Sequence, residues 1–142
     1  MSRLAPEALA AWTAFLRAHS SITRALERQL DEAHGLTLSD YDVLVQLREA
    51  GRGLRPVELS RAVLLTRSGV TRLVQGLERA GLVERVDCPE DQRGHLVQLT
   101  DAGRAALGRA TRTHLEGVRA LFADRLDDGE LSTVAAVLTR LA

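Results

Sequence analysis

The sequence of 142 residues contains no Lys and no Asn, and only one Cys, one Trp and one Tyr. A single Cys excludes an internal disulfide and is typical of a reducing cytosol. Aromatic residues make up 3% of the chain, which disfavours an RNA-binding surface built on stacked bases. No apolar run is long enough to span a bilayer, and residues 1–7 lack the apolar run of a signal peptide. We therefore expect a cytoplasmic protein with no membrane partner.

All 19 basic residues are Arg, and they are unevenly distributed although the formal net charge is zero. Residues 51–79 carry six Arg and two acids, a local net charge of +4, whereas residues 1–50 carry five Arg and seven acids. Residues 113–142 carry three Arg and five acids. The central basic segment is what a polyanion would contact, although chance clustering of solvated Arg gives the same count. The exclusive use of Arg is typical of a GC-rich bacterial genome, and it makes every fixed cation a bidentate donor.

The first half of the chain has apolar residues at helical spacing. This spacing predicts a long helix over 5–33, which at ~1.5 Å per residue would extend about 43 Å. We interpret Ser39 with Asp42 as the capping box of a second helix that ends at Gly51. Pro56 suits the first position of a short third helix.

In the second half of the chain, the apolar residues follow helical spacing in some segments and strand spacing in others. Residues 67–80, capped by Thr66, are predicted to be a helix. Residues 82–87 and 95–99 are predicted to be the strands of a hairpin. A second long helix is expected over 101–123, and a last helix follows it. This order is typical of a helix-turn-helix followed by a wing.

The predicted helix over 67–80 has two chemically different faces. Its apolar residues share one side, and the opposite side is polar and free of acids except Glu78 near its edge. Base edges in the major groove present hydrogen-bond donors and acceptors, so this side suits a recognition helix. An ordinary solvated amphipathic helix is the alternative. The residues that we expect to contact DNA from this helix are Arg67, Ser68, Thr71, Arg72 and Gln75.

Three further residues extend the predicted DNA contacts. Arg93, beside Gly94 at the hairpin tip, is placed to enter a minor groove, and Asp91 is placed to hold its guanidinium. A polar turn with a weak exposed ion pair is the alternative. Arg55, at the start of the short helix, is the candidate phosphate contact.

Several segments together resemble the MarR-type transcriptional regulators. The resemblance covers essentially the whole chain, and the ordered set is more specific than any one piece. Gln92 replaces the Arg that is common between the Asp and Arg of the wing signature. The matching segments are residues 36–44 (start of the second helix), 66–74 (recognition helix), 81–85 with 91–94 (wing, with its Asp-x-Arg signature) and 99–103 (strand-to-helix junction).

The resemblance implies a mainly helical fold with a small β-hairpin wing. It implies one MarR-like domain over 1–142, with a winged helix-turn-helix DNA-binding region over 36–100. Residues 5–35 and 101–142 would form a helical dimerisation region, which agrees with apolar stripes longer than a small winged domain can cover. Folding back of these helices on their own domain is the alternative.

The function that the resemblance implies is that of a homodimeric regulator of transcription. Such proteins are usually repressors that bind double-stranded DNA and are often released by a small ligand or an oxidant. We expect an inverted-repeat operator, because a two-fold dimer presents two recognition helices. A winged-helix protein-interaction module that does not bind DNA is the alternative. The sequence has no enzyme motif, and we expect no cofactor.

The remaining candidate residues concern regulation. By resemblance, ligands of this family bind between the first helices and the winged region, so Trp12, His19 and Tyr41 are candidates to hold a small aromatic or phenolic ligand. Ordinary core packing is the alternative. The four His residues are scattered, so we expect no metal site. Cys88 has acidic neighbours that oppose thiolate formation, so we expect no redox role for it.

Overall fold

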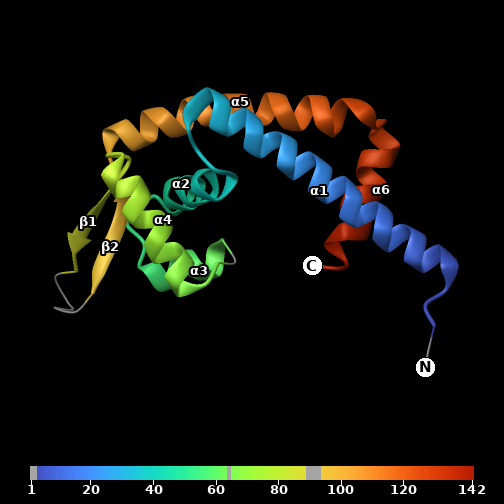
Figure 1. Ribbon diagram of the computed structural model, residues 1–142, viewed down its shortest axis with the longest axis horizontal. Coiled ribbons are helices and arrows are strands. Elements are labelled where there is room, and N and C mark those ends of the chain that lie inside the picture. The colour runs from blue at the N-terminus through green and yellow to red at the C-terminus, as the bar shows by residue number, and fades with distance from the viewer. Residues whose placement is uncertain (1–2, 64, 89–93) are drawn as a thin grey trace.

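The computed structural model describes residues 3–63, 65–88 and 94–142, with Arg67 described by its backbone alone. The chain forms an arch (Figure 1). One limb holds the small helices and the hairpin, two long helices form the top, and the last helix forms the other limb with the start of the first. The elements are α1 (Pro6–His34), α2 (Leu38–Ala50), α3 (Pro56–Ala62), α4 (Arg67–Arg79), β1 (Val83–Asp87), β2 (His95–Leu99), α5 (Asp101–Leu121), the 3₁₀ turn η1 (Ala123–Arg125) and α6 (Asp128–Thr139).

The fold is therefore mainly helical with a two-stranded antiparallel hairpin, as expected. None of the helices in the described ranges combines the length and the hydropathy needed to cross a membrane. The expected helix over 101–123 ends earlier, at Leu121, and the chain then turns through η1. Asp127 caps α6 and shares a capping box with Glu130.

The prediction that Ser39 caps the second helix is wrong, because the helix begins two residues earlier. Thr37 is the N-cap: its side chain accepts a hydrogen bond from the Asp40 N–H at 2.9 Å, and the Asp40 carboxylate accepts from the Thr37 N–H at 2.9 Å. The next free amide, that of Leu38, donates to the Glu27 carboxylate of α1 at 2.7 Å. The capping box of Thr37 with Asp40 and the hydrogen bond from Leu38 to Glu27 together stabilise the earlier start of α2.

The hairpin is joined to the helices through its second strand. Val83 pairs with Leu99, and Arg85 pairs with Val97, in an antiparallel register. Val97 also exchanges two backbone hydrogen bonds with Leu54, at 2.9 and 2.8 Å, so the loop before α3 extends the sheet by one bridge. β2 therefore lies between β1 on one side and the segment before α3 on the other.

The core lies where α2, α3 and α4 meet the hairpin and the two long helices. Each of these elements contributes a side chain that is almost fully buried, so the winged part and the long helices share one hydrophobic core. The fully buried side chains include Leu30, Leu44, Leu59, Val74, Val97 and Leu107.

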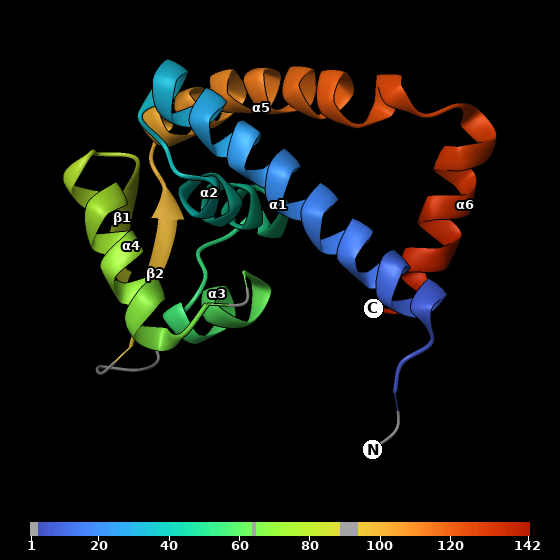
Figure 2. The ribbon, with the colours of Figure 1, turned by 45° about the vertical axis from the view of Figure 1, so that its right-hand side comes forward.

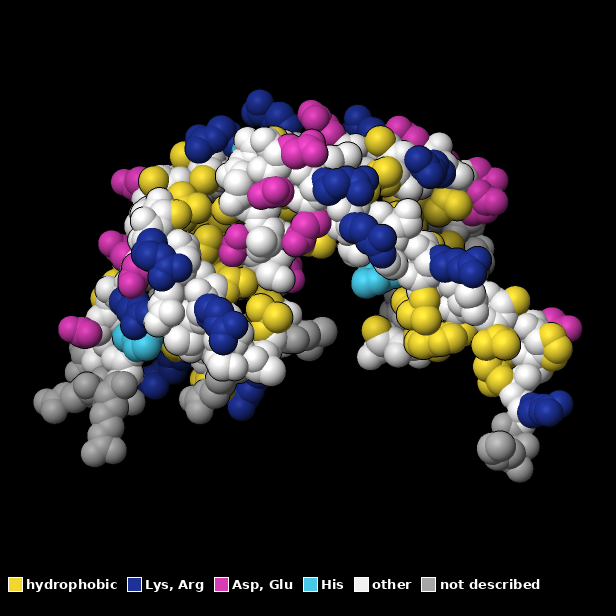
Figure 3. Space-filling view, viewed as in Figure 1, with side chains coloured by type: hydrophobic (Ala, Val, Ile, Leu, Met, Phe, Trp, Pro, Cys, Tyr) yellow, Lys and Arg dark blue, Asp and Glu magenta, His cyan; other side chains and the backbone are white. Residues whose placement is uncertain are grey.

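The two long helices pack closely near the winged part and separate toward the other limb (Figures 1 and 2). A Cβ at Gly117 of α5 would collide with the side chains of Leu26 and Gln29 of α1, so the absence of a side chain permits the close approach. Toward the start of α1, other helices no longer cover the apolar side chains, and Trp12 and Phe15 are 55% and 44% exposed. Figure 3 shows hydrophobic side chains gathered on this limb.

Candidate nucleic-acid interface

Helix α4 lies on the outer side of the winged part, with the hairpin and α3 beside it (Figures 1 and 2). Its start is fixed by Thr66, whose side-chain oxygen accepts from the Gly69 N–H at 3.1 Å. Val70, Val74 and Leu77 are buried, each at most 3% exposed, and they anchor the helix to the core. One side of α4 is thus held by packing, as predicted, and the opposite side faces away from the core.

The outward side of α4 carries the predicted polar residues. Ser68, Thr71, Arg72 and Gln75 are all exposed or half-exposed. The Ser68 hydroxyl lies 3.2 Å from the Thr66 hydroxyl, which fixes it at the first turn. The side chains of this face span about two helical turns, a length that suits contacts with several successive base pairs.

The acid at the edge of this face is paired. Glu78 forms an ion pair with Arg85 of β1, with 3.1 Å between the carboxylate oxygen and Nε. The pair partly neutralises a charge that would repel phosphates, and it connects α4 to the hairpin. This role of Arg85 could not be predicted from the sequence, because the contact joins a helix to a strand and follows neither periodicity.

Arg55 lies before α3, where it was expected, and its side chain is half-buried. One of its guanidinium nitrogens donates to Cys88 Sγ at 3.6 Å, so the cation lies between the helix-turn-helix and the end of β1. Its backbone N–H lies 3.5 Å from the Glu58 carboxylate. The Arg52 guanidinium, which donates to Glu58 at 2.8 Å, lowers the pKa of that carboxyl below its ordinary value. The ionised form of the Glu58 carboxylate is therefore favoured.

Two of the predicted contacts, Asp91 and Arg93 at the hairpin tip, lie outside the described residues. The side chain of Arg67 is likewise outside them. Within the described residues, the candidate interface therefore consists of the outward side of α4 and Arg55.

The three residues predicted to hold an aromatic ligand do not form one pocket within the chain. Tyr41 is buried at 8% exposure, and its ring lies 4.6 Å from that of His114 in α5. Trp12 lies on the uncovered part of α1, with its ring 6.0 Å from Phe15. His19 lines a largely apolar groove between α1, the end of α5 and α6, to which neither Tyr41 nor Trp12 contributes. Tyr41 therefore belongs to the core, as the packing alternative supposed.

The contact of His114 with Tyr41 joins α5 to α2 and has no local signal in the sequence. The Nδ1 atom of His114 is buried and has no hydrogen-bond partner within the described part of the chain. Burial lowers the pKa of His114 below its ordinary value, and the nearby Asp42 carboxylate partly opposes this effect. His114 therefore favours the neutral form at the contact between α2 and α5.

Among the residues that the structure describes, no group of three or more His, Cys, Asp or Glu side chains is arranged to hold a metal ion. The geometry instead defines a class of protein: a winged helix-turn-helix with a polar, Arg-bearing outer helix. Such a helix is the reading element of many DNA-binding proteins.

Comparisons with known proteins agree with this class. A family model described as MarR family matches residues 34–94. The HTH-type transcriptional regulator PecS of Dickeya dadantii is 28% identical over 127 residues, covering 86% of this chain and 76% of PecS. AbsC, a MarR family transcriptional regulator from Streptomyces coelicolor, superposes with a TM-score of 0.91 at 30% identity, over 99% of this chain and 95% of AbsC.

A further solved structure contains nucleic acid. Sco3205, a MarR family transcriptional regulator from Streptomyces coelicolor in complex with DNA, gives a TM-score of 0.91 at 33% identity, over 98% of this chain and 91% of Sco3205. The present chain belongs to the MarR family, a family of transcriptional regulators.

Proposed function

We propose that this chain is a homodimeric, cytoplasmic repressor that binds double-stranded DNA at an inverted-repeat operator. In this proposal residues 36–100 bind DNA, and residues 5–35 and 101–142 form the dimer interface. The observation that carries the proposal is the outward side of α4, where Ser68, Thr71, Arg72 and Gln75 face solvent on a helix whose other side is locked into the core. The DNA complex of Sco3205, which has the same fold, supports it.

The dimer is supported by the apolar groove between α1, the end of α5 and α6. Phe15, Ile22, Val134 and Leu138 line it, and Leu138 is 38% exposed in the single chain. A second copy would remove this surface from water. A two-fold dimer would place two α4 helices on one side of the duplex, which favours half-sites about 10 bp apart.

A protein-interaction module is the second candidate function. Such a module is expected to expose large apolar side chains at its docking face. The residues on the outer side of α4 are instead hydroxyl, amide and guanidinium side chains. This chemistry favours DNA.

Release from DNA by a small aromatic or phenolic ligand is the regulatory part of the proposal. Its support is the family resemblance, since Trp12, His19 and Tyr41 share no pocket within one chain. Linkage requires that operator DNA weakens ligand binding by the same factor as the ligand weakens DNA binding. Titration with benzoate-like compounds, followed by Trp12 fluorescence with and without operator DNA, tests this reciprocity.

The DNA contacts are tested with matched arginine variants and DNA from the region flanking the gene. Arg72→Ala should cost about 1–3 kcal/mol of binding free energy and relax sequence specificity, because a guanidinium on α4 pairs with base edges. Arg55→Ala should weaken binding evenly across sequences and reduce the salt slope by about 1, because it loses a phosphate contact. Arg3→Ala, at an exposed arginine before α1, is the control and should bind as the wild type does.

Fluorescence anisotropy at several salt concentrations measures all three variants. Equal losses in the three variants, or equal binding of random and flanking DNA by the wild type, would contradict the assignment of the contacts. A footprint on one asymmetric half-site would contradict the inverted repeat. Replacement of Arg93 is expected to weaken binding most at sites with A/T-rich flanks.

A further inference from the structure

The last turn of α4 carries an acid on the side that is proposed to contact DNA. Glu78 continues the series Ser68, Thr71 and Gln75, in which successive residues are three or four positions apart and therefore share one stripe of the helix. A carboxylate on this stripe repels phosphates, and in the last turn it also opposes the helix dipole. Neither DNA binding nor helix stability therefore accounts by itself for an acid at this position.

The turn after α4 brings a cation to this acid. Gly81 adopts the left-handed conformation, with a φ of 75°, and its N–H donates to the Glu78 carbonyl at 3.0 Å. The chain turns back there, and β1 lies beside α4 (Figures 1 and 2). Val83 is buried at 2% exposure, and Arg85 lies two residues later, on the same side of the strand. The Arg85 Nε atom consequently lies 3.1 Å from the Glu78 carboxylate.

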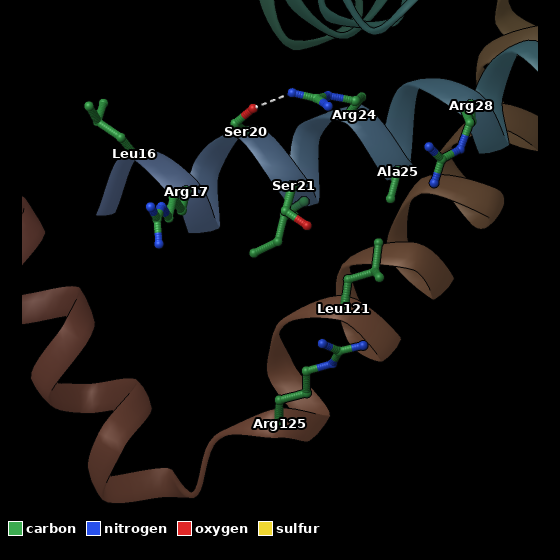
Figure 4. Close-up of a pocket in the computed structure, with 10 residues that line it drawn as sticks. Leu16, Arg17, Ser20, Ser21, Arg24, Ala25, Arg28, Leu121 and Arg125 are labelled. Atoms are coloured by element: carbon green, nitrogen blue, oxygen red, sulfur yellow. Dashed lines mark hydrogen bonds between the residues drawn. The ribbon is translucent and has the colours of Figure 1, made fainter. Parts of the chain in front are cut away.

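This ion pair joins two elements, whereas other arginine contacts lie within one helix. Arg104 pairs with Asp101 inside α5 at 3.0 Å. Arg24 donates to a hydroxyl inside α1 at 2.9 Å, as Figure 4 shows. The pair of Glu78 with Arg85 exists instead only while β1 lies against α4. Both of its side chains stay partly exposed, 40% for Glu78 and 37% for Arg85, so a phosphate beside α4 would interact with their charges.

We propose that Arg85 is a positioning residue for DNA binding that acts through Glu78. Its guanidinium holds the carboxylate toward β1 and compensates its charge, so the DNA-contacting stripe of α4 does not repel phosphates. Glu78 in turn makes the affinity of α4 depend on the wing, because separation of β1 from α4 would leave an uncompensated acid on that stripe. This inference rests on the proposed binding of DNA and assigns a role to two residues outside the proposed contacts.

Fluorescence anisotropy tests the proposal with two duplexes of equal length, one from the region flanking the gene and one of random sequence. At low salt, Arg85→Gln should weaken binding of both about two- to fivefold, and added salt should reduce this loss. Arg85→Lys, which keeps the charge, should lose less. Glu78→Gln should bind at least as tightly as the wild type, and the double variant Glu78→Gln/Arg85→Gln should regain wild-type affinity.

A second double variant controls for net charge. Glu84→Gln/Arg85→Gln removes the same two charges, but Glu84 points to the opposite side of β1, where it accepts from the Gln98 side chain at 2.7 Å. This variant should stay as weak as Arg85→Gln. Its comparison with Glu78→Gln/Arg85→Gln separates the position of the acid from the total charge of the wing.

Three results would overturn the proposal. If Arg85 contacted a phosphate directly, Arg85→Gln would cause the same loss with and without Glu78→Gln. If the pair only tethered the wing, Glu78→Gln alone would weaken binding as Arg85→Gln does. If net charge decided the affinity, both double variants would recover equally. A wild type that binds neither duplex would contradict the proposed function itself, whereas a wild type that binds DNA beside an unchanged Arg85→Gln would contradict this inference alone.

Discussion

His114 lies half-buried between α2 and α5, and burial lowers its pKa below the ordinary value, which favours the neutral form. Its ring lies against Tyr41, and its buried Nδ1 finds no partner in the described residues. A polar contact joins the same two helices, since the Tyr41 hydroxyl of α2 donates to the Thr111 hydroxyl of α5 at 3.4 Å. The contact between the winged part and the long helix α5 therefore includes a group whose protonation is unfavourable in the folded state.

This arrangement predicts a pH dependence of stability. The lowered pKa of His114 means that, as pH falls below about 6.5, the unfolded chain takes up a proton that the folded chain resists. The free energy of unfolding should therefore decrease from pH 7.5 to pH 5.5, with a slope below about 1.4 kcal/mol per pH unit. Solvent contact of the half-buried ring keeps the slope under this limit.

Urea unfolding at several pH values, at one protein concentration, measures the effect. In His114→Phe the aromatic contact with Tyr41 is kept and the titrating group is lost, so the fall in stability over this pH range should be smaller. An identical pH dependence in the wild type and His114→Phe would show that other groups cause it.

The start of each helix depends on the residue that caps it, and part of this capping could be predicted from the sequence. Thr66 caps α4, as predicted from the sequence. Thr100 caps α5 through the Gly103 N–H, and Asp127 caps α6 through the Glu130 N–H. The start of α2 could not be predicted, because Thr37 with Asp40 and Ser39 with Asp42 have the same spacing. The choice depends on Glu27 of α1, which accepts from the Leu38 N–H. Such a contact between distant segments has no local signal.

The junction between β2 and α5 permits a matched test of packing. A Cβ at Gly103 would overlap the Leu82 carbonyl, which Thr100 holds through its N–H at 3.1 Å. Gly103→Ala should therefore destabilise the protein by about 1–3 kcal/mol, because backbone must move. A Cβ added at Gly108, also in α5, would meet no atom within 4 Å among the described residues. Gly108→Ala should therefore stabilise the protein by about 0.5–1 kcal/mol.

Chemical denaturation of both variants measures the two effects. The opposite signs are the test, since both replacements add the same methyl group to the same helix. Equal changes in the two variants would show that helix propensity, rather than the contact with Leu82, determines the effect at Gly103.

At the scale of the whole molecule, part of the apolar surface of the long helices stays exposed to solvent in the single chain. Phe15 is 44% exposed in the groove beside α6. Phe15→Glu should therefore change the proposed dimer into a monomer, because it places a charge where apolar surface would be buried. Val86→Glu, at a residue on the hairpin with 37% exposure, is the matched control and should remain dimeric.

Light scattering at micromolar concentration distinguishes these states. Phe15→Glu should also lose affinity for the full operator, because a single α4 helix buries too little surface for a specific site. A monomeric wild type, or dimers in both variants, would contradict the proposed interface.

The candidate interface was more predictable than the candidate ligand site, for a physical reason. The polar and apolar sides of α4 follow from helical periodicity, and the sequence of this one segment is enough to show them. A pocket requires that distant segments meet, and the aromatic residues of the first two helices carry no information on that point. Tyr41 packs with His114, whereas Trp12 extends from the far limb.

The backbone bridge between Leu54 and Val97 links two segments that are distant in sequence, and it has a consequence for local opening. Each residue donates its amide to the carbonyl of the other. Neither amide can exchange its hydrogen with solvent until the same two bonds separate, so their protection factors should be similar and high relative to the hairpin end. Amide exchange followed by NMR would detect this pairing. The wing and the segment before α3 would then open as one cooperative unit, and the position of the wing relative to α4 would be kept during binding.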